Sequence, residues 1–241
     1  MSETTLLVSL CTYNEAENLP LLVPRILDTV PQAHVLVVDD NSPDGTGRIA
    51  DEMAAKDPRV KVLHRTGKLG LGTATLAAFQ FAADQGYEFV LNLDADFSHP
   101  PETIPELLKL ASDADVVIGS RYVPGGKIEG WGLKRHFMSR GVNFYSRLLL
   151  RLPTRDCSGA FRCYRVSLLR KLDWSKIRGK GYAFQEEILY RCRRVGGRFK
   201  ETPIQFVDRR YGSSKINMRE AMIAMWVILR LGIENLRGVP V

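Results

Sequence analysis

The first 120 residues alternate between five short apolar runs rich in β-branched residues and four longer segments with helical periodicity. The apolar runs predict strands at residues 5–11, 34–39, 60–64, 88–93 and 115–119, and the segments between them predict helices at residues 12–29, 45–56, 71–83 and 101–111. Strands that alternate with helices build a parallel, doubly wound sheet, because each parallel connection needs a crossover. Such a sheet binds ligands at the carboxyl ends of its strands.

The pattern is less regular after residue 120. A Gly-rich stretch at residues 123–132 is followed by predicted helices at 135–152, 184–195 and 216–236, and by predicted strands at 160–164 and 200–207. No segment has the composition of a disordered linker. We therefore expect residues 1–215 to form one domain with two halves, 1–120 and 121–215, and residues 216–241 to form an amphipathic helix and tail.

Charge is distributed unevenly between the two halves. Residues 1–120 contain 8 Lys and Arg against 18 Asp and Glu, whereas residues 121–241 contain 26 against 9. The first half suits a cation, and the second half suits an anionic partner such as nucleic acid, a phosphorylated substrate or a membrane surface.

Cysteine usage and hydropathy indicate the compartment. The 4 cysteines include no CxxC pair, which favours reduced thiols over a disulfide framework. The N-terminus lacks the features of a signal peptide, and the charge-free run at residues 221–229 is far shorter than the roughly 20 residues that span a bilayer. We expect a cytoplasmic protein without a transmembrane helix.

Two acidic clusters follow predicted strands. Asp94, Asp96 and Ser98 alternate along the chain, so in an extended segment their oxygens would face one point and form part of a site for Mg²⁺ or Mn²⁺. A turn or helix N-cap before residue 101 is the alternative. Asp39 and Asp40 could accept hydrogen bonds from a nucleobase or ribose, or the segment could cap the next helix through Ser42 or Asp44.

The ordered motifs of this chain resemble those of inverting GT-A glycosyltransferases of family 2, and more closely those of the dolichyl-phosphate (polyprenyl-phosphate) mannose synthases. The resemblance spans nearly the whole chain and rests on residues 12–15, 39–46, 67–74, 94–101, 119–122, 130–131, 134–135, 139–141, 156–162, 181–187 and 208–215. It implies a GT-A (Rossmann-like) fold, a mostly parallel sheet flanked by helices, with C-terminal amphipathic helices. The family usually has Pro where Cys11 stands, and some members have Gln in place of Ser98.

The resemblance also implies roles for individual residues. The nucleotide of GDP-mannose would be held by Thr12, Tyr13, Glu15, Asp39, Asp40, Lys68 and Asp94. The divalent cation, Mg²⁺ or Mn²⁺, would be held by Asp94, Asp96 and Ser98. The acceptor phosphate would be held by Arg121, Arg135, Arg209, Ser214 and Lys215, and the catalytic set would be Asp96, Arg121, Arg135 and Arg209. Positioning roles fall to Asp156, Gln185 and Glu187.

Arginine suits the expected acceptor site, because its planar fork binds a phosphate through two hydrogen bonds. For any single arginine of this set, a surface salt bridge is the alternative. The predicted helices at 135–152 and 216–236 add a second clue, since each combines an arginine stripe with a wide apolar face. Such helices can lie on an anionic membrane surface, or they can pack on the domain, in a homodimer or against a membrane-protein partner.

The implied reaction is transfer of mannose from GDP-mannose to a polyprenyl or dolichyl monophosphate with inversion. A phosphate monoester is mostly dianionic at neutral pH, so it needs no catalytic base. Were the acceptor a sugar hydroxyl, Asp156 or Glu187 would become base candidates. The alternatives are another nucleotide sugar such as UDP-glucose, another acceptor, or a non-enzymatic nucleic-acid or membrane-surface binding protein. We find no stacking platform or nucleic-acid-binding motif and expect no nucleic-acid partner.

Overall fold

The computed structural model describes residues 5–179, 181, 183–208 and 218–237. Its strands are β1 (Leu6–Thr12), β2 (His34–Asp39), β3 (Val60–His64), β4 (Phe89–Asp94), β5 (Val116–Ser120), β6 (Lys127–Glu129), β7 (Arg162–Arg165), β8 (Phe199–Pro203) and β9 (Gln205–Val207). Its α-helices are α1 (Leu19–Thr29), α2 (Thr46–Lys56), α3 (Leu71–Asp84), α4 (Ile104–Ala111), α5 (Leu133–Leu150), α6 (Val166–Leu169), α7 (Phe184–Arg194) and α8 (Met218–Leu236). Two 3₁₀ turns, η1 (Pro101–Thr103) and η2 (Trp174–Lys176), complete the described elements.

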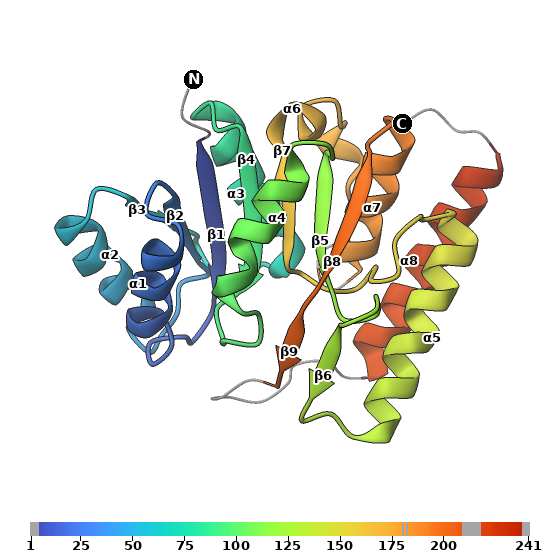
Figure 1. The fold of residues 1–241 in the computed structure, drawn as a ribbon, viewed down its shortest axis with the longest axis horizontal. Helices are drawn as coiled ribbons and strands as arrows, with labels where there is room; N and C mark the ends of the chain where they lie inside the picture. Colours follow the sequence, from blue (N-terminus) through green and yellow to red (C-terminus); the bar gives the residue numbers. More distant parts are fainter. Residues whose placement is uncertain (1–4, 180, 182, 209–217, 238–241) are drawn as a thin grey trace.

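The strands form one large sheet with the order β3-β2-β1-β4-β7-β5-β8. Neighbouring strands are parallel, except that β7 runs antiparallel to both β4 and β5. The predicted mostly parallel sheet is confirmed (Figure 1).

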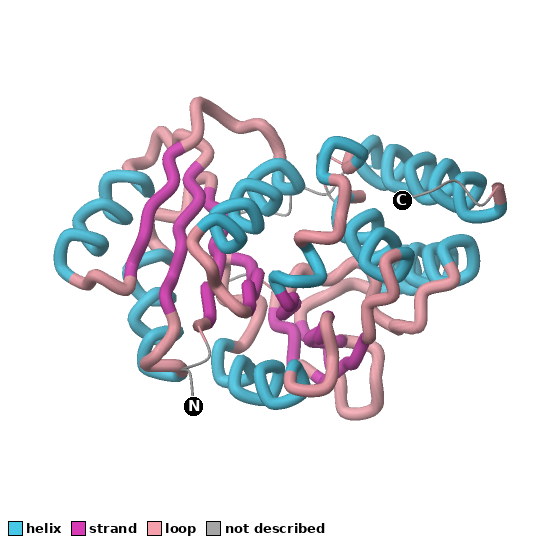
Figure 2. Tube along the Cα trace, turned by 90° about the horizontal axis from the view of Figure 1, so that it is seen from above, coloured by secondary structure: helices cyan, strands magenta, loops and turns pink. Residues whose placement is uncertain are grey.

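Two apolar cores hold helices against the two faces of this sheet (Figure 2). Side chains alternate between the faces of a strand, and β1 illustrates the division. Leu6 and Val8 pack in the core that includes α1 and α4, whereas Leu7 packs in the core that includes α3, α7 and α8. The sheet is therefore covered on both sides, and its polar ligands must bind at an edge.

The first predicted helix begins later than we expected. Thr12 is the last residue of β1, and residues 13–18 form a loop before α1 begins at Leu19. In a capping box the Thr12 hydroxyl would accept from the Glu15 backbone N–H. Instead it donates to Asp39 at 2.9 Å, and the Glu15 N–H donates to Thr46 Oγ1 at 2.9 Å. The prediction of a helix from residue 12 was wrong because these tertiary bonds replace the local cap.

The predicted strand at 200–207 is also divided. β8 lies in the main sheet beside β5, whereas β9 pairs in parallel with β6, which lies within the Gly-rich stretch 123–132. Ile204, between the two strands, is buried and donates its backbone N–H to Ser120 at 3.0 Å. This division brings the segment around β6 close to the end of β5.

Helices α5 and α8 pack side by side at one flank of the molecule (Figure 1). Their outer surfaces expose large apolar side chains, namely Leu133, Phe137, Met138, Phe144 and Leu148 of α5 and Met222, Ile223, Met225, Trp226, Leu229, Ile233 and Leu236 of α8. Among the described residues, no helix combines the length and hydropathy that crossing a bilayer requires.

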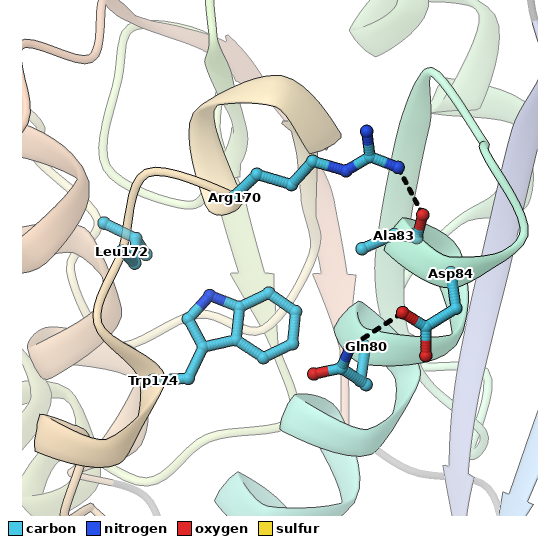
Figure 3. A pocket seen from close by; sticks show the side chains of 6 residues that line it. All are labelled: Gln80, Ala83, Asp84, Arg170, Leu172 and Trp174. Carbon is cyan, nitrogen blue, oxygen red and sulfur yellow. Dashed lines mark hydrogen bonds between the residues drawn. The ribbon is translucent and has the colours of Figure 1, made fainter.

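A cavity of about 370 Å³ lies between the end of α3 and the segment from α6 to η2 (Figure 3). This is the sheet edge at which β4 begins, opposite the carboxyl ends of β1, β2 and β4. Its polar groups bond locally: Gln80 donates to Asp84 at 2.8 Å, and Arg170 donates to the Ala83 carbonyl. None of the described residues that we expect to bind substrate lines this cavity.

Candidate active site

The carboxyl ends of β1, β2 and β4 meet at one edge of the sheet. β1 lies between the other two, because Thr12 pairs with Asp39 of β2 and Cys11 pairs with Asp94 of β4. The two acidic clusters therefore lie at the same edge, one strand apart.

Past Asp94 the chain turns at once and does not continue as the extended segment that we expected. Residues 95 and 96 form a turn, and Phe97 has a φ of +62°. The Asp96 carboxylate accepts from the Ser98 backbone N–H at 3.1 Å, which closes an Asx-type turn. The orientation of Asp94 and Asp96 is therefore set by a turn and not by strand alternation.

The oxygen groups of this turn fit a hard divalent cation. Ser98 Oγ is buried and has no hydrogen-bond partner within the described part of the chain, although buried hydroxyls normally find one. No cluster of three or more His, Cys, Asp or Glu side chains that could hold a metal occurs among the described residues. The carboxylate and hydroxyl oxygens of the turn are ligands that suit Mg²⁺ or Mn²⁺, since such an ion can take one or two carboxylates and complete its shell from substrate phosphates and water.

His99 holds this turn through one hydrogen bond to its backbone. Its Nδ1 accepts from the Asp94 backbone N–H at 3.1 Å, and its ring stacks on Phe161 with centroids 5.3 Å apart. Burial lowers the pKa of His99 to about 4, against the opposing charge of Asp96. A neutral imidazole that accepts at Nδ1 carries its proton at Nε2. His99 thus holds the backbone of the turn.

On the neighbouring strand, Asp39 joins two loops. Its buried carboxylate accepts from Thr12 Oγ1 at 2.9 Å, from Ser42 N at 3.0 Å and from Ser42 Oγ at 2.6 Å. Asp44 accepts from the Thr46 backbone N–H at 3.0 Å just before α2, although the N-cap residue of this helix is Gly45 and neither Ser42 nor Asp44. Asp39 therefore fixes the shape of the loops on both sides.

Asp40 pairs with a cation from the end of β3. Arg65 Nη1 lies 2.6 Å from its carboxylate, and both side chains are largely buried. Burial raises the pKa of Asp40, and the charge of Arg65 opposes this shift. Arg65 also donates to Thr73 Oγ1 at 2.6 Å, which ties Asp40 to the start of α3.

Tyr13 and Lys68 meet beside these loops. Lys68 Nζ lies 4.1 Å from the centroid of the Tyr13 ring, a cation–π contact. Nearby, the Glu15 carboxylate accepts from Asn18 Nδ2 at 2.8 Å. The expected nucleotide-binding residues from three separate segments are therefore neighbours.

On the basic side, Arg121 follows β5 and is buried. Its Nε and Nη2 each lie 2.7 Å from a carboxylate oxygen of Asp156, and Nη2 also donates to Ser158 Oγ at 3.0 Å. Burial alone would lower the pKa of Arg121, but the charge of Asp156 outweighs it and raises that pKa. Burial would likewise raise the pKa of Asp156, which Arg121 holds below its usual range.

Arg135 lies at the start of α5 and is partly exposed. Its guanidinium carbon lies 4.0 Å from the centroid of the Trp131 ring, and Nη1 lies 2.9 Å from Asp208. The centroid of the Trp131 ring also lies 5.4 Å from the Arg121 guanidinium, so both arginines lie close to the same ring. The remaining expected acceptor residues, Arg209, Ser214 and Lys215, lie outside the described residues.

The expected positioning residues of α7 are fully buried. Glu187 accepts from the Arg178 and Gly179 backbone N–H groups at 3.0 and 2.7 Å and forms a salt bridge with Arg191. The Gln185 backbone carbonyl accepts from Arg162 Nη1 at 2.7 Å, while its side-chain Nε2 has no partner among the described residues. Glu187 thus anchors the loop before α7.

Two further buried charges were missed by the sequence analysis. Arg162 of β7 is 0% exposed and Glu186 of α7 is 2% exposed, and each has one buried polar atom without a partner in the described chain. Burial raises the pKa of Glu186 to about 7, against the charge of Arg162. The burial of Arg162 could have been foreseen, because an arginine within an apolar strand is unusual. The burial of Glu186 could not, because nothing in the sequence distinguishes it from the adjacent Glu187.

The doubly wound sheet, with an acidic turn at the end of its central strand, defines a glycosyltransferase of the GT-A fold. The model of the family described as Glycosyl transferase family 2 matches residues 8–173, and the chain belongs to this family. Polyprenol monophosphomannose synthase of Mycolicibacterium smegmatis is 47% identical over 240 residues, which cover 97% of this chain and 90% of that protein. Undecaprenyl-phosphate mannosyltransferase of Micrococcus luteus is 48% identical over 206 residues, 86% of this chain and 85% of that protein.

Solved structures share the fold at lower identity. Mannosyl-3-phosphoglycerate synthase from Rubrobacter xylanophilus superposes with a TM-score of 0.67 at 18% identity, covering 98% of this chain and 74% of that one. The mannosyltransferase PcManGT from Pyrobaculum calidifontis, solved with GDP-Man and Mn²⁺, gives a TM-score of 0.58 at 16% identity, covering 97% and 74% of the two chains. These likenesses support the GT-A architecture.

Proposed function

We propose that this chain transfers mannose from GDP-mannose to a polyprenyl monophosphate, with inversion at the anomeric carbon. The two relatives at 47% and 48% identity are named for polyprenol or undecaprenyl phosphate and mannose. One observation carries the proposal: an oxygen-rich acidic turn at Asp94 and Asp96 shares the sheet with a buried arginine, Arg121, at the end of β5. Such a site suits two anionic substrates, one of which arrives with a cation.

On the donor side, the loops fixed by Asp39 and Asp40 would hold the nucleoside, with Tyr13 and Lys68 at its border. The turn of Asp94, Asp96 and Ser98 would hold Mg²⁺ or Mn²⁺. When bound, such an ion neutralises charge on the diphosphate of the departing nucleotide. The neutral His99 keeps the Asp94 backbone in place during this step, because its Nδ1 already accepts that N–H.

On the acceptor side, Arg121 and Arg135 would attract and orient the phosphate, together with Arg209, Ser214 and Lys215. A phosphate monoester has a second pKa near 6, so its oxygen reaches the site already ionised. The engagement of the nearby carboxylates supports this acceptor over a sugar hydroxyl. Asp156 is held below its usual pKa by Arg121, and Glu187 is bonded to two backbone N–H groups and Arg191, so both are poor bases.

A lipid acceptor places the enzyme at a membrane surface, and the flank formed by α5 and α8 is suited to that contact. Phe144 and Trp226 are 69% and 62% exposed. Arg140 and Arg147 of α5 are exposed, and so is Arg237 directly after α8, as in amphipathic helices that bind anionic leaflets. We propose peripheral attachment to the cytoplasmic leaflet through this flank.

The test is a transfer assay with radiolabelled GDP-mannose and purified protein. Polyprenyl monophosphates of short and long chain are supplied in detergent, with Mg²⁺, with Mn²⁺ or with EDTA. We expect organic-extractable mannosyl lipid only when a divalent ion is present. Parallel reactions with UDP-glucose and with free sugar acceptors examine the rival donor and acceptor. Transfer to a sugar hydroxyl without transfer to lipid phosphate would overturn the proposal that the acceptor is a polyprenyl monophosphate.

Attachment is tested separately by co-sedimentation with vesicles containing anionic lipid. Replacing Phe144 and Trp226 by Ser should weaken sedimentation at least several-fold, while transfer to a short-chain acceptor in detergent is retained. Leu21, which is 61% exposed on α1, provides the control, because L21S removes an exposed apolar side chain from another surface. Equal sedimentation of all three proteins would exclude the flank as the attachment surface.

A further inference from the structure

Beside Arg121, the hydroxyl of Ser158 receives two hydrogen bonds. Arg121 Nη2 donates to Ser158 Oγ at 3.0 Å, and Nδ2 of Asn143 from α5 donates to the same oxygen at 3.2 Å. A serine hydroxyl accepts two hydrogen bonds and donates one. Since both acceptor positions are occupied, its proton must point away from Arg121 and Asn143.

Within the described chain this proton has no acceptor. Ser158 is only half-buried, so the hydroxyl can reach a molecule bound at the surface of the site. The neighbouring guanidinium is arranged similarly. Nε and Nη2 of Arg121 are used by Asp156 and Ser158, while Nη1 has no hydrogen-bond acceptor among the described residues. An O–H and an N–H donor are thus left unpaired beside each other.

Asn143 determines this arrangement. Its side chain is 4% exposed and fully bonded: Oδ1 accepts from the Cys157 backbone N–H at 2.6 Å, and Nδ2 donates to the Ser139 carbonyl at 2.8 Å as well as to Ser158. An amide held at both ends has one orientation. It therefore presents a donor to Ser158 and forces the hydroxyl to act as a donor in turn.

We propose that the Ser158 hydroxyl donates a hydrogen bond to the acceptor phosphate beside Arg121, and that Asn143 is the positioning residue that orients it. This inference rests on the proposed function, because it assigns a residue to the phosphate of that acceptor. A hydrogen bond from a neutral hydroxyl to a charged phosphate oxygen is among the stronger ones in proteins.

The experiment measures binding of farnesyl phosphate by calorimetry without donor, and the KM for each substrate in the transfer assay. In S158A we expect affinity for farnesyl phosphate to fall about tenfold, and the acceptor KM to rise by a similar factor, with little change in the KM for GDP-mannose. S158T keeps the hydroxyl and should restore most of the affinity. N143A should change the same two quantities in the same direction as S158A.

The matched control is Ser146, another serine of α5. It is fully buried, and its hydroxyl donates to the Val142 carbonyl at 2.8 Å within the helix. S146A should leave both KM values unchanged. Thermal unfolding of each variant identifies loss of folding, and if N143A does not fold, the S158A and S158T pair decides the matter.

An unchanged affinity for farnesyl phosphate in S158A would overturn the proposal. So would an equal loss of affinity for both substrates, because that pattern indicates general damage to the Arg121 pair. Failure of the proposed function has a different result: the wild-type protein would not transfer mannose to lipid phosphate. Calorimetry with farnesyl phosphate would still report on Ser158 in that case.

Discussion

Arg121 and Asp156 form a buried ion pair in which two guanidinium nitrogens each lie 2.7 Å from a separate carboxylate oxygen. The Arg121 backbone N–H donates to the same carboxylate at 3.0 Å. Glu201 of β8 holds the Asp156 loop by accepting from two consecutive backbone N–H groups, at 2.7 and 3.0 Å. The fork of Arg121 is therefore fixed before any substrate binds.

Replacing Asp156 by Asn should destabilise the protein by about 3–5 kcal/mol, because it leaves a buried guanidinium without its counter-charge. We also expect the KM for the lipid acceptor to rise more than the KM for GDP-mannose. Urea unfolding and steady-state kinetics measure the two effects. The exposed helical pair of Arg48 and Glu52 is the control, and E52Q should change stability by about 0.5 kcal/mol or less. Similar losses in D156N and E52Q would contradict the importance of burial.

The position of the acidic turn could be predicted from the sequence, whereas its shape could not. Apolar runs of strand length place Asp39 and Asp94 at strand ends, and a parallel topology puts those ends at one edge. The tight turn after Asp94 depends on Phe97 adopting a positive φ, for which sequence patterns give little signal outside Gly, Asn and Asp. The turn is also held by the side chain of His99, which accepts a hydrogen bond from the Asp94 backbone N–H.

Long-range pairing was likewise not available from local patterns. The insertion of antiparallel β7 between β4 and β5 and the pairing of β6 with β9 join segments more than 40 residues apart. Arg121 and Asp156 were each singled out, but nothing in their spacing of 35 residues indicated that they bind one another. Hydrophobic periodicity specifies which face is buried, and not which strand lies beside it.

Replacing Ser98 by Ala should change metal affinity more than stability. Its hydroxyl is buried without a partner in the described chain, so its removal should lower stability by less than about 1 kcal/mol. If Ser98 is a neutral ligand of the cation, binding of GDP in the presence of Mn²⁺ should weaken about threefold to tenfold. Calorimetry with and without MnCl₂ measures this. D96N should abolish the Mn²⁺-dependent part of GDP binding. If Mn²⁺ strengthens GDP binding equally in D96N and the wild type, the cation does not bind at this turn.

Replacing Lys68 by Gln tests whether this residue lies at the edge of the nucleotide-binding site. The exposed contact of its ammonium with the Tyr13 ring, at 4.1 Å, contributes about 0.5–1 kcal/mol at most to folding. We expect unfolding to be nearly unchanged, while affinity for GDP falls several-fold through loss of a charge near the phosphates. K109Q, an exposed lysine of α4, is the control for net charge. Equal GDP affinities in the two variants would exclude Lys68 from the donor site.

The adjacent residues Glu186 and Glu187 should respond oppositely to neutralisation. Burial raises the pKa of Glu186 from 4.5 to about 7, so between these values the folded protein keeps a proton that the unfolded chain has lost. The folded state then binds more protons, and its stability falls as pH rises through this window. E186Q removes the cost of ionising a buried carboxyl in the folded state. It should match the wild type near pH 5 and become more stable than the wild type by pH 8, where Glu186 is ionised in the folded state.

E187Q should instead destabilise the protein at pH 8, because Glu187 accepts from two backbone N–H groups and pairs with Arg191 through its charge. Urea unfolding at pH 5, 6, 7 and 8 measures all three proteins. A difference between E186Q and the wild type that stays constant across this range would show that Glu186 does not titrate there. At pH 8 the two substitutions should change stability in opposite directions. The Glu187 carboxylate has its partners in the folded state, whereas Oε2 of Glu186 has none within the described chain.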